Sequence, residues 1–341
     1  MPETYGFQRL APAPGRAFFF LQGALVLFYN EDMTSLSLIV PCYNEQEALQ
    51  PFMQELSRVL ADLPGVQPEV VLVNDGSADD TLQVMRGLSA QYDYVRYISF
   101  SRNFGKESAM LAGFAAAKGD YVAVMDADLQ DPPALLPEML RVVREEGYDC
   151  AGTRRTTRKG EPPIRSFFAR MFYRFINMIS HTQLVDGARD YKLLSRKAVD
   201  ALLAMPEYNR FSKGLYEWIG FRTKWLEFEN VERVAGETKW SFWKLFKYSL
   251  EGIVAFTTVP LALASLLGML CMLVALVIIV SLCVRQMVWH SSVDGWTSMV
   301  CIIVLLSGLQ LFCVGIIGQY ISKMYMEIKR RPHYIIAEQS E

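Results

Sequence analysis

The sequence predicts an α/β domain with a mostly parallel sheet, followed by amphipathic interfacial helices and two transmembrane helices. One observation is the alternation of short apolar runs with amphipathic runs between residues 36 and 153, which is typical of parallel α/β sheets. A second is the presence of two uncharged runs, 253–284 and 295–322, each long enough to cross a bilayer. A third is an apolar run that ends in three acids, Asp126, Asp128 and Asp131.

The alternation is regular enough to assign elements in order, because strands and helices differ in apolar period. The expected strands are 36–40, 70–73, 95–100, 121–125 and 149–153, and the expected helices are 45–60, 79–90, 106–117 and 133–146. Ligands of such sheets bind beyond the carboxyl ends of the strands. The segments at those ends, 41–45, Asp75 and 126–128, are therefore candidate site residues.

The acidic segment after residue 125 is the first candidate site. Alternate residues of an extended chain point the same way, so Asp126 and Asp128 are expected to face one point. Two such carboxylates repel each other unless a cation lies between them, and Mg²⁺ or Mn²⁺ suits oxygen ligands. The alternative is an acidic strand-to-helix turn without a metal. Asp131, which precedes two prolines, is expected to cap the next helix.

Several other classes of protein are disfavoured. The net charge of −2 indicates no nucleic-acid partner. The six cysteines are scattered without a Cys-x-x-Cys or Cys/His cluster, so neither a disulfide framework nor a zinc site is expected. The segment 104–107 is similar to the end of a P-loop, but Phe100 stands in place of the first glycine and Glu107 in place of Ser/Thr, which disfavours a Walker-type NTPase.

Two basic, aromatic segments after Thr153 indicate contact with a membrane surface. Aromatic and aliphatic residues recur at helical spacing over about 163–180 with Arg165, Arg170 and Arg174 between them, as in interfacial helices. The alternative is a helix that packs on the domain core. In the second segment, 231–252, tryptophans stand beside lysines ahead of a long apolar run, which fits the headgroup region.

The two uncharged runs predict the membrane helices, and lysines and arginines crowd their outer flanks. By the positive-inside rule, both termini and the α/β domain are expected in the cytoplasm. Every motif lies after Met33, so residues 1–32 are expected to be dispensable. The predicted organisation is an extension (1–33), the α/β domain (34–230), the second interfacial segment (231–252), two transmembrane helices (253–322) and a cytoplasmic tail (323–341).

Several motifs, in this order and spacing, together resemble the inverting family-2 glycosyltransferases of the GT-A fold. The resemblance is nearest to the bactoprenol (polyprenyl-phosphate) glucosyltransferases, relatives of dolichyl-phosphate mannose synthase, and covers nearly everything after residue 33. The motifs are Pro41-x-Tyr43-Asn44-Glu45, Asp75-Gly76-Ser77, Ser101 to Lys106, Asp126-Ala127-Asp128-Leu129-Gln130, Asn209-Arg210-Phe211-x-Lys213 and Glu232 to Lys239.

The resemblance implies a role for each matching residue. The residues that would bind the nucleotide sugar are Pro41, Tyr43, Glu45, Val73, Asp75, Asp126, Ala127, Arg154, Arg233 and Lys239. Mg²⁺ or Mn²⁺ and the diphosphate would be held by Asp126, Asp128 and Gln130, with Asp128 and Asp190 as catalytic residues. The basic residues expected to bind the acceptor are Arg165, Arg170, Arg174, Arg210 and Lys213.

Asp190 departs from the family pattern in its surroundings. Arg189-Asp190-Tyr191-Lys192 stands where relatives often have Gly-Asp-Phe-Arg, and the extra cation should lower the pKa of Asp190. A phosphate monoester is mostly dianionic at neutral pH and needs little help from a base. We therefore expect Asp190 to position the acceptor or its basic partners, with Lys192 and Arg154 as the candidate partners.

The resemblance thus implies transfer of a sugar, with UDP-glucose as the expected donor, to polyprenyl phosphate. The expected location is the cytoplasmic face of a bacterial inner membrane, where the product would serve modification of cell-envelope glycans. Alternative donors are UDP-N-acetylglucosamine and UDP-4-amino-arabinose derivatives. A non-catalytic membrane scaffold is a second alternative, which the intact set of metal and phosphate residues disfavours. Interfacial aromatics could also serve contacts in a homo-oligomer.

Overall fold

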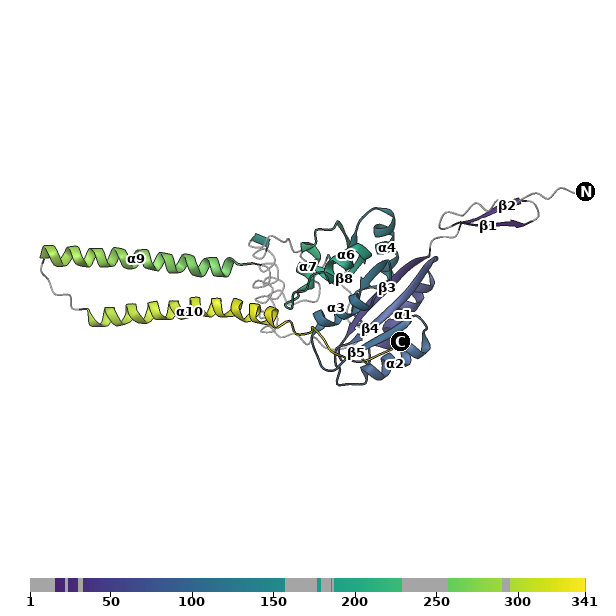
Figure 1. Ribbon diagram of the computed structural model, residues 1–341, viewed down its shortest axis with the longest axis horizontal. Coiled ribbons are helices and arrows are strands. Elements are labelled where there is room, and N and C mark those ends of the chain that lie inside the picture. The colour runs from purple at the N-terminus through teal and green to yellow at the C-terminus, as the bar shows by residue number, and fades with distance from the viewer. Residues whose placement is uncertain are drawn as a thin grey trace, which may run out of the picture.

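The computed structural model describes residues 16–21, 24–29, 33–156, 177–178, 185, 187–228, 257–289 and 295–340. Its main part is an eight-stranded mixed sheet with helices on both faces, and two long helices project from one end (Figure 1). The predicted fold class, a mostly parallel α/β sheet followed by two long apolar helices, is confirmed.

The elements of the sheet domain largely follow the predicted alternation as far as β7, and the later ones have no counterpart in the prediction. Ahead of the domain, β1 (Arg16–Leu21) and β2 (Ala24–Tyr29) form a separate antiparallel pair. The domain contains β3 (Thr34–Cys42), α1 (Leu49–Ala61), β4 (Val66–Asn74), α2 (Thr81–Gln91), β5 (Val95–Phe100), α3 (Lys106–Ala116), β6 (Tyr121–Val124), the 3₁₀ turn η1 (Pro133–Leu135), α4 (Leu136–Glu145), β7 (Cys150–Arg155), β8 (Ala188–Ser195), α6 (Arg196–Leu203), α7 (Ser212–Trp218), β9 (Thr223–Phe228) and β10 (Ile336–Gln339).

The order of the strands reverses in the middle of the sheet. The order is β10-β5-β4-β3-β6-β8-β7-β9, in which β5, β4, β3 and β6 are parallel and β8 is antiparallel to both its neighbours. The chain proceeds outward from β3 to β5 and then returns to the opposite side of β3 with β6. Ligands of open α/β sheets bind where the order reverses in this way, so the carboxyl ends of β3 and β6 mark the expected site.

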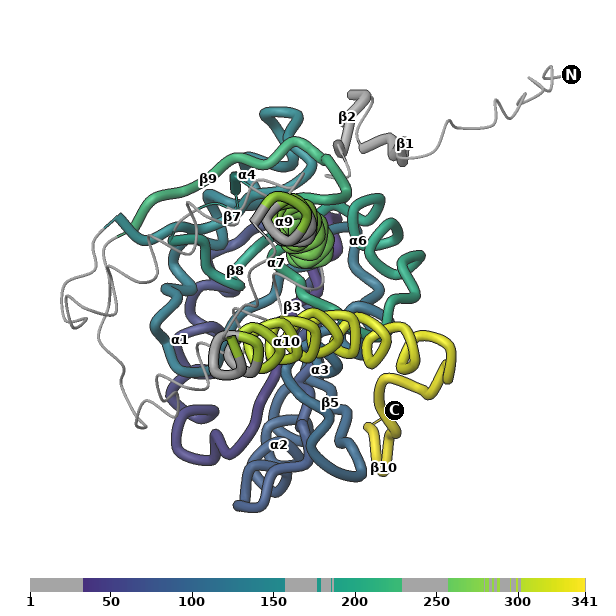
Figure 2. Tube along the Cα trace, turned by 90° about the vertical axis from the view of Figure 1, so that its left-hand side faces the viewer, coloured from purple at the N-terminus to yellow at the C-terminus, as the bar shows by residue number. Residues whose placement is uncertain are grey.

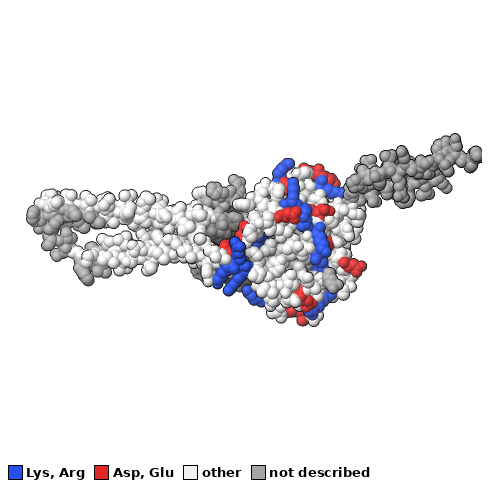
Figure 3. All heavy atoms as spheres, viewed as in Figure 1, with Lys and Arg blue, Asp and Glu red and all other residues white. Residues whose placement is uncertain are grey.

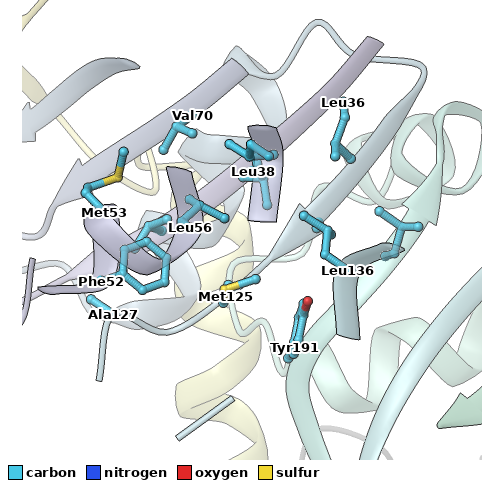
Figure 4. Close-up of a cluster of buried hydrophobic side chains, with 14 of the residues drawn as sticks. Leu36, Leu38, Phe52, Met53, Leu56, Val70, Met125, Ala127, Leu136 and Tyr191 are labelled. Atoms are coloured by element: carbon cyan, nitrogen blue, oxygen red, sulfur yellow. The ribbon is translucent and has the colours of Figure 1, made fainter. Parts of the chain in front are cut away.

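Alternating apolar side chains bury both faces of the sheet. Leu38 and Val70 face a core covered by α1, α2 and α4, whereas Ile39 and Val71 face a core covered by α3, α6 and α7. Figure 4 shows the first core, in which Phe52 of α1 packs close to Leu56 and Met125. Phe52 is fully buried, and truncating such a side chain to alanine typically costs about 3–5 kcal/mol.

The segment after the second long helix returns to the sheet. β10 pairs antiparallel with β5 (Figure 2), and Tyr334 stacks on Phe100 with ring centroids 5.0 Å apart. Glu338 accepts hydrogen bonds from Arg86 Nε at 2.9 Å and from the Tyr97 hydroxyl at 2.6 Å. The segment predicted as a tail therefore supplies the edge strand of the sheet.

The two long helices, α9 (Val259–Trp289) and α10 (Trp296–Lys329), lie side by side and antiparallel (Figure 1). The Tyr320 hydroxyl of α10 donates to the carbonyl of Thr257, just before α9, at 2.7 Å. Both helices are long and apolar enough to cross a membrane, and their described length carries almost no charge outside the end next to the domain (Figure 3).

Candidate active site

A lysine lies between the acidic residues of two strands at the point where the strand order reverses. Lys106, the first residue of α3, places its Nζ 2.7 Å from Asp126 Oδ1 and 2.6 Å from Asp190 Oδ2. Asp126 follows β6 and Asp190 belongs to the neighbouring strand β8. Sheet pairing therefore brings together two carboxylates that are far apart in the chain, and the ammonium group of Lys106 compensates their charge.

Asp190 is surrounded by cations. Lys213 Nζ of α7 lies 3.8 Å from Asp190 Oδ1 and donates to the carbonyl of Ala188 at 3.1 Å. Burial alone would raise the pKa of Asp190, but Lys106 and Lys213, with a smaller contribution from Arg189, hold that pKa well below its ordinary value. The predicted direction is confirmed, although the lysines contribute more than Arg189.

The partners predicted for Asp190 are wrong. Lys192 is buried, and its Nζ lies 3.3 Å from Glu217 and over the rings of Tyr216 and Trp225. Arg154 donates from Nε to Glu227 at 3.0 Å. Although Asp190 and Lys192 are only two residues apart on β8, Glu217 pairs with Lys192, whereas Lys106 and Lys213 pair with Asp190.

Arg189 is held by Asp131, which does not cap a helix as expected. Arg189 Nε donates to Asp131 Oδ1 at 2.6 Å, and Asp131 is fully buried. The helix begins after Pro132 without a side-chain cap. This pair joins the acidic loop to β8. Asp131 Oδ2 and the hydroxyl of Tyr191 are buried without a hydrogen-bond partner among the described residues.

The acidic loop is not an extended continuation of the strand. β6 ends at Val124, the chain turns over 127–131, and Leu129 has a φ of 56°. The extended-chain reason for pairing Asp126 with Asp128 is therefore wrong. Asp128 Oδ1 instead accepts from the backbone N–H of Gln130 at 3.2 Å.

The donor atoms of this loop fit a divalent ion shared with a substrate. Among the described residues, no three His, Cys, Asp or Glu side chains form a complete metal site. Mg²⁺ commonly uses one or two carboxylates and takes its remaining ligands from water and phosphate. The side chains of Asp126, Asp128 and Gln130 can each offer an oxygen atom to such an ion. Asp126 already lies next to one cation, the ammonium group of Lys106.

Asp75 organises the loop that carries Lys106. Its carboxylate is almost fully buried and accepts from the backbone N–H groups of Phe104 at 2.7 Å and Gly105 at 3.0 Å. Burial raises the pKa of Asp75 despite these bonds. Gly76 has a φ of +61°, and a Cβ there would lie 2.3 Å from the backbone carbon of Arg102. The Asp75-Gly76 pair therefore allows the two loops to meet.

The structure places the remaining candidates for nucleotide binding around the same strand ends, with differing exposure. Tyr43 is exposed and Glu45 half-buried after β3. The side chains of Val73 and Ala127 are buried in the core, so a ligand would meet their backbone. Pro41 lies within β3.

The two described residues that were predicted to bind the acceptor, Arg210 and Lys213, take different positions. Arg210 donates to the backbone carbonyls of Met205 at 2.8 Å and Leu202 at 3.3 Å, so it closes the end of α6, whereas Lys213 reaches Asp190. The other predicted basic residues, Arg165, Arg170, Arg174, Arg233 and Lys239, lie outside the described residues, as do both interfacial segments except residues 177 and 178.

Sequence reasoning missed Lys106 and Glu107. Glu107 accepts from the backbone N–H of Ser212 at 3.0 Å and from its hydroxyl, and so holds the start of α7 beside the site. The sequence Gly105-Lys106-Glu107 at the start of a helix could have indicated these two residues. It was considered only as the end of a P-loop and was given no other role.

Comparisons with known proteins show similarity to glycosyltransferases over most of the chain. The model of the family described as glycosyl transferase family 2 matches residues 37–203. The chain is 45% identical to the CsbB protein of Bacillus subtilis, whose name describes a glycosyltransferase, over 89% of this chain and 91% of that one. It is 36% identical to a prophage bactoprenol glucosyl transferase homolog of Escherichia coli K12 over 88% and 98% of the two chains, and to the bactoprenol glucosyl transferase of Shigella phage SfII over 88% and 97%.

Among solved structures, the chain is similar to glucosyl-3-phosphoglycerate synthase from Mycobacterium tuberculosis, in complex with Mn²⁺, UDP-glucose and phosphoglyceric acid. The TM-score is 0.43, the identity is 19%, and the match covers 65% of this chain and 78% of that chain.

Proposed function

Because this chain belongs to glycosyl transferase family 2, we propose that it transfers glucose from UDP-glucose to polyprenyl phosphate with inversion at the anomeric carbon. One observation carries the proposal. The group Asp126, Lys106, Asp190 and Lys213 is joined, through the loop before α7, to the end of the apolar helix α10. A nucleotide-sugar site at the base of a membrane hairpin suits an acceptor whose phosphate lies at the headgroup level and whose tail lies in the bilayer.

The reaction needs a nucleophile, a leaving group and little proton transfer. An oxygen of the acceptor phosphate would attack the anomeric carbon as the bond to the diphosphate breaks, and UDP would leave with the bonding electrons. The acceptor phosphate is mostly dianionic at neutral pH, so no base is required. Asp190, held ionised by its lysines, suits stabilisation of the positive charge that develops on the sugar ring.

Each side of the site would bind a different phosphate. Mg²⁺ or Mn²⁺ held by Asp126, Asp128 and Gln130 would neutralise the departing diphosphate. Arg154, Arg233 and Lys239 are the proposed further contacts to the donor phosphates. Lys213, together with the basic residues Arg165, Arg170 and Arg174, is the proposed set that attracts and orients the acceptor phosphate.

The same reasoning supports an orientation in the membrane. The two helices form a hairpin whose two ends lie at the sheet domain, and UDP-sugars are cytoplasmic. We infer that the domain and both termini face the cytoplasm of a bacterial inner membrane. Lysines and arginines gather where the hairpin meets the domain (Figure 3), among them Lys329, Arg330 and Arg331, as the positive-inside rule expects.

Donor identity is the central test. Membranes that contain the protein should convert radiolabelled UDP-glucose and added polyprenyl phosphate into an organic-soluble product, and membranes without the protein should not. Radiolabelled UDP-N-acetylglucosamine is the matched comparison, with an amino-arabinose donor as a third arm. A product from another donor would correct the sugar but keep the acceptor. No lipid product from any donor would favour the scaffold alternative.

A further inference from the structure

The domain end of α10 holds the loop that leads into α7. The carboxylate of Glu327 accepts from the backbone N–H of Tyr208 at 2.8 Å, and from the backbone N–H and side-chain amide of Asn209, each at 3.0 Å. Lys323, one turn earlier on the same helix face, donates from Nζ to Asn209 Oδ1 at 3.0 Å. Two charged residues of α10 therefore fix both the backbone and the side chain of Asn209.

This loop leads directly to the active site. Phe211 is buried, and Ser212 donates its backbone N–H to Glu107, the neighbour of Lys106, at 3.0 Å. The next residue, Lys213, reaches Asp190. The contacts made by Glu327 are thus only a few residues from Lys213, the cation beside Asp190. The chain between them is further restrained because Ser212 is also hydrogen-bonded.

The contact also lies at a definite depth relative to a bilayer. The uncharged part of α10, from Trp296 to Ser322, is 27 residues long, and a helix of roughly 20 residues crosses the hydrocarbon core. Lys323 and Glu327 therefore lie beyond the core, on the side of the domain. A lipid phosphate would lie at the same level.

We propose that Glu327 is a positioning residue for the acceptor side of the reaction. By holding the 208–212 loop against α10, it sets Lys213 at Asp190 at the depth where the lipid phosphate arrives. This role rests on the proposed function, because a soluble acceptor would not require a fixed depth. It concerns the acceptor step and not binding of the donor, whose described candidate residues lie on or just after β3, β4 and β6 and on β7.

Kinetics of two Glu327 variants test the role. Glu327→Ala removes every acceptor oxygen at the contact, whereas Glu327→Gln keeps one. Since a misplaced catalytic group can cost about 10²-fold, Glu327→Ala should lower kcat for transfer to polyprenyl phosphate by roughly 10–100-fold. The KM for the UDP-sugar should stay near that of the wild-type enzyme, and Glu327→Gln should recover most of the rate.

Glu338→Ala is the matched control. Glu338 also ties the segment after α10 to the domain, but at the β5 edge through Arg86 and Tyr97. Its loss should leave kcat and both KM values near those of the wild-type enzyme. If Glu338→Ala lowers kcat as strongly as Glu327→Ala, general attachment of α10 explains the effect and the specific role of Glu327 is wrong.

Amide hydrogen exchange tests the contact without any turnover. Exchange over 208–213 should be faster in full-length Glu327→Ala than in the wild-type protein, with exchange in β3 and β4 unchanged. Unchanged exchange over 208–213, or faster exchange with an unchanged kcat, would overturn the proposal. A wild-type enzyme that makes no lipid-linked sugar would contradict the proposed function, and the exchange measurement would still decide whether Glu327 holds the loop.

Discussion

The charge on Asp190 decides which chemistry this side chain can perform. Lys106 and Lys213 lower its pKa, so the carboxylate is ionised at every pH at which the enzyme is expected to work. A carboxylate with so low a pKa is a poor general base. Its fixed negative charge is instead suited to holding two cations in place and to stabilising positive charge on the sugar.

Asp190→Asn should therefore lower kcat by roughly 10²–10³-fold, the usual cost of losing a group that stabilises transition-state charge. The dissociation constant of the UDP-sugar should not change. The acid limb of the pH–rate profile should remain near the second pKa of the phosphate, about 6. Asp190 would be identified as a base by two results together. The acid limb of the wild-type pH–rate profile would disappear in Asp190→Asn, and it would not move when an acceptor with a lower phosphate pKa is used.

Asp128→Ala should abolish transfer if the acidic loop holds a divalent ion. The loss of one of two carboxylate ligands should cost at least about 10²-fold in rate, because the diphosphate then leaves without its counter-charge. EDTA should remove the activity of the wild-type enzyme, and added Mg²⁺ or Mn²⁺ should restore it. Circular dichroism should be unchanged. Asp62→Ala, at an exposed Asp after α1, is the control. Full activity in EDTA would contradict metal dependence.

At this scale the sequence could predict residue types at strand ends but not their partners. Asp126 and Asp190 were both candidates, yet Lys106 connects them across 20 and 84 residues of chain. Asp131 had the local signature of a helix cap, and a residue 58 positions away pairs with it instead. Local spacing carries no information on such contacts, because sheet pairing brings them together.

Among the elements, those from β3 to β7 could be predicted because their apolar periods are local and strong. β10 could not, since Ile336–Gln339 is short and its pairing depends on an open edge of β5. The interval from β8 to β9 also escaped prediction. Its strands are interrupted by charges, among them Lys192, whose burial is compensated by Glu217 only in the folded domain.

Attachment of β10 should depend on pH. Hydrogen bonds from Arg86 and Tyr97 lower the pKa of Glu338 to about 2. A carboxylate with a depressed folded pKa contributes stability that is fully present above its unfolded pKa, about 4.3, and is lost as pH falls toward the folded value. Protection of the β10 amides, measured relative to their intrinsic exchange rates at each pH, should therefore fall between about pH 4 and pH 2. In Glu338→Gln the protection should already be lower at pH 7. Equal protection at pH 7 in both proteins would contradict this role of Glu338.

For the whole molecule, the antiparallel packing of α9 and α10 returns the chain to the end of the hairpin at which the sheet domain lies. Because β10 pairs with β5, the chain that follows α10 lies at the sheet domain, and a hairpin inserted in a membrane would keep both on one side of it. The positive-inside rule predicted the same arrangement from the flanking lysines and arginines. The sequence alone could not indicate that strand pairing would enforce it.

The topology can be tested with labels on whole cells. A cysteine placed at Ser292, between the two helices, should react with a membrane-impermeant maleimide from the periplasmic side. Of two reporters fused after Glu341, the one that works in the cytoplasm should be active and the one that works in the periplasm should be inactive. A cysteine at Asp62 provides the internal control, since it should react only after the cells are opened. A periplasmic reporter would overturn the orientation and the access to UDP-sugars.

The position of β10 also has a consequence for synthesis of the protein. The edge strand β10 follows both long apolar helices in the chain, so translation produces it after every other strand of the sheet. If both helices cross the membrane, the β5 edge stays open until the second helix has returned the chain to the side of the sheet domain. A nascent chain whose second helix fails to insert cannot close that edge. Since an exposed strand edge is a common starting point for aggregation, a misinserted copy should aggregate more readily than a finished one.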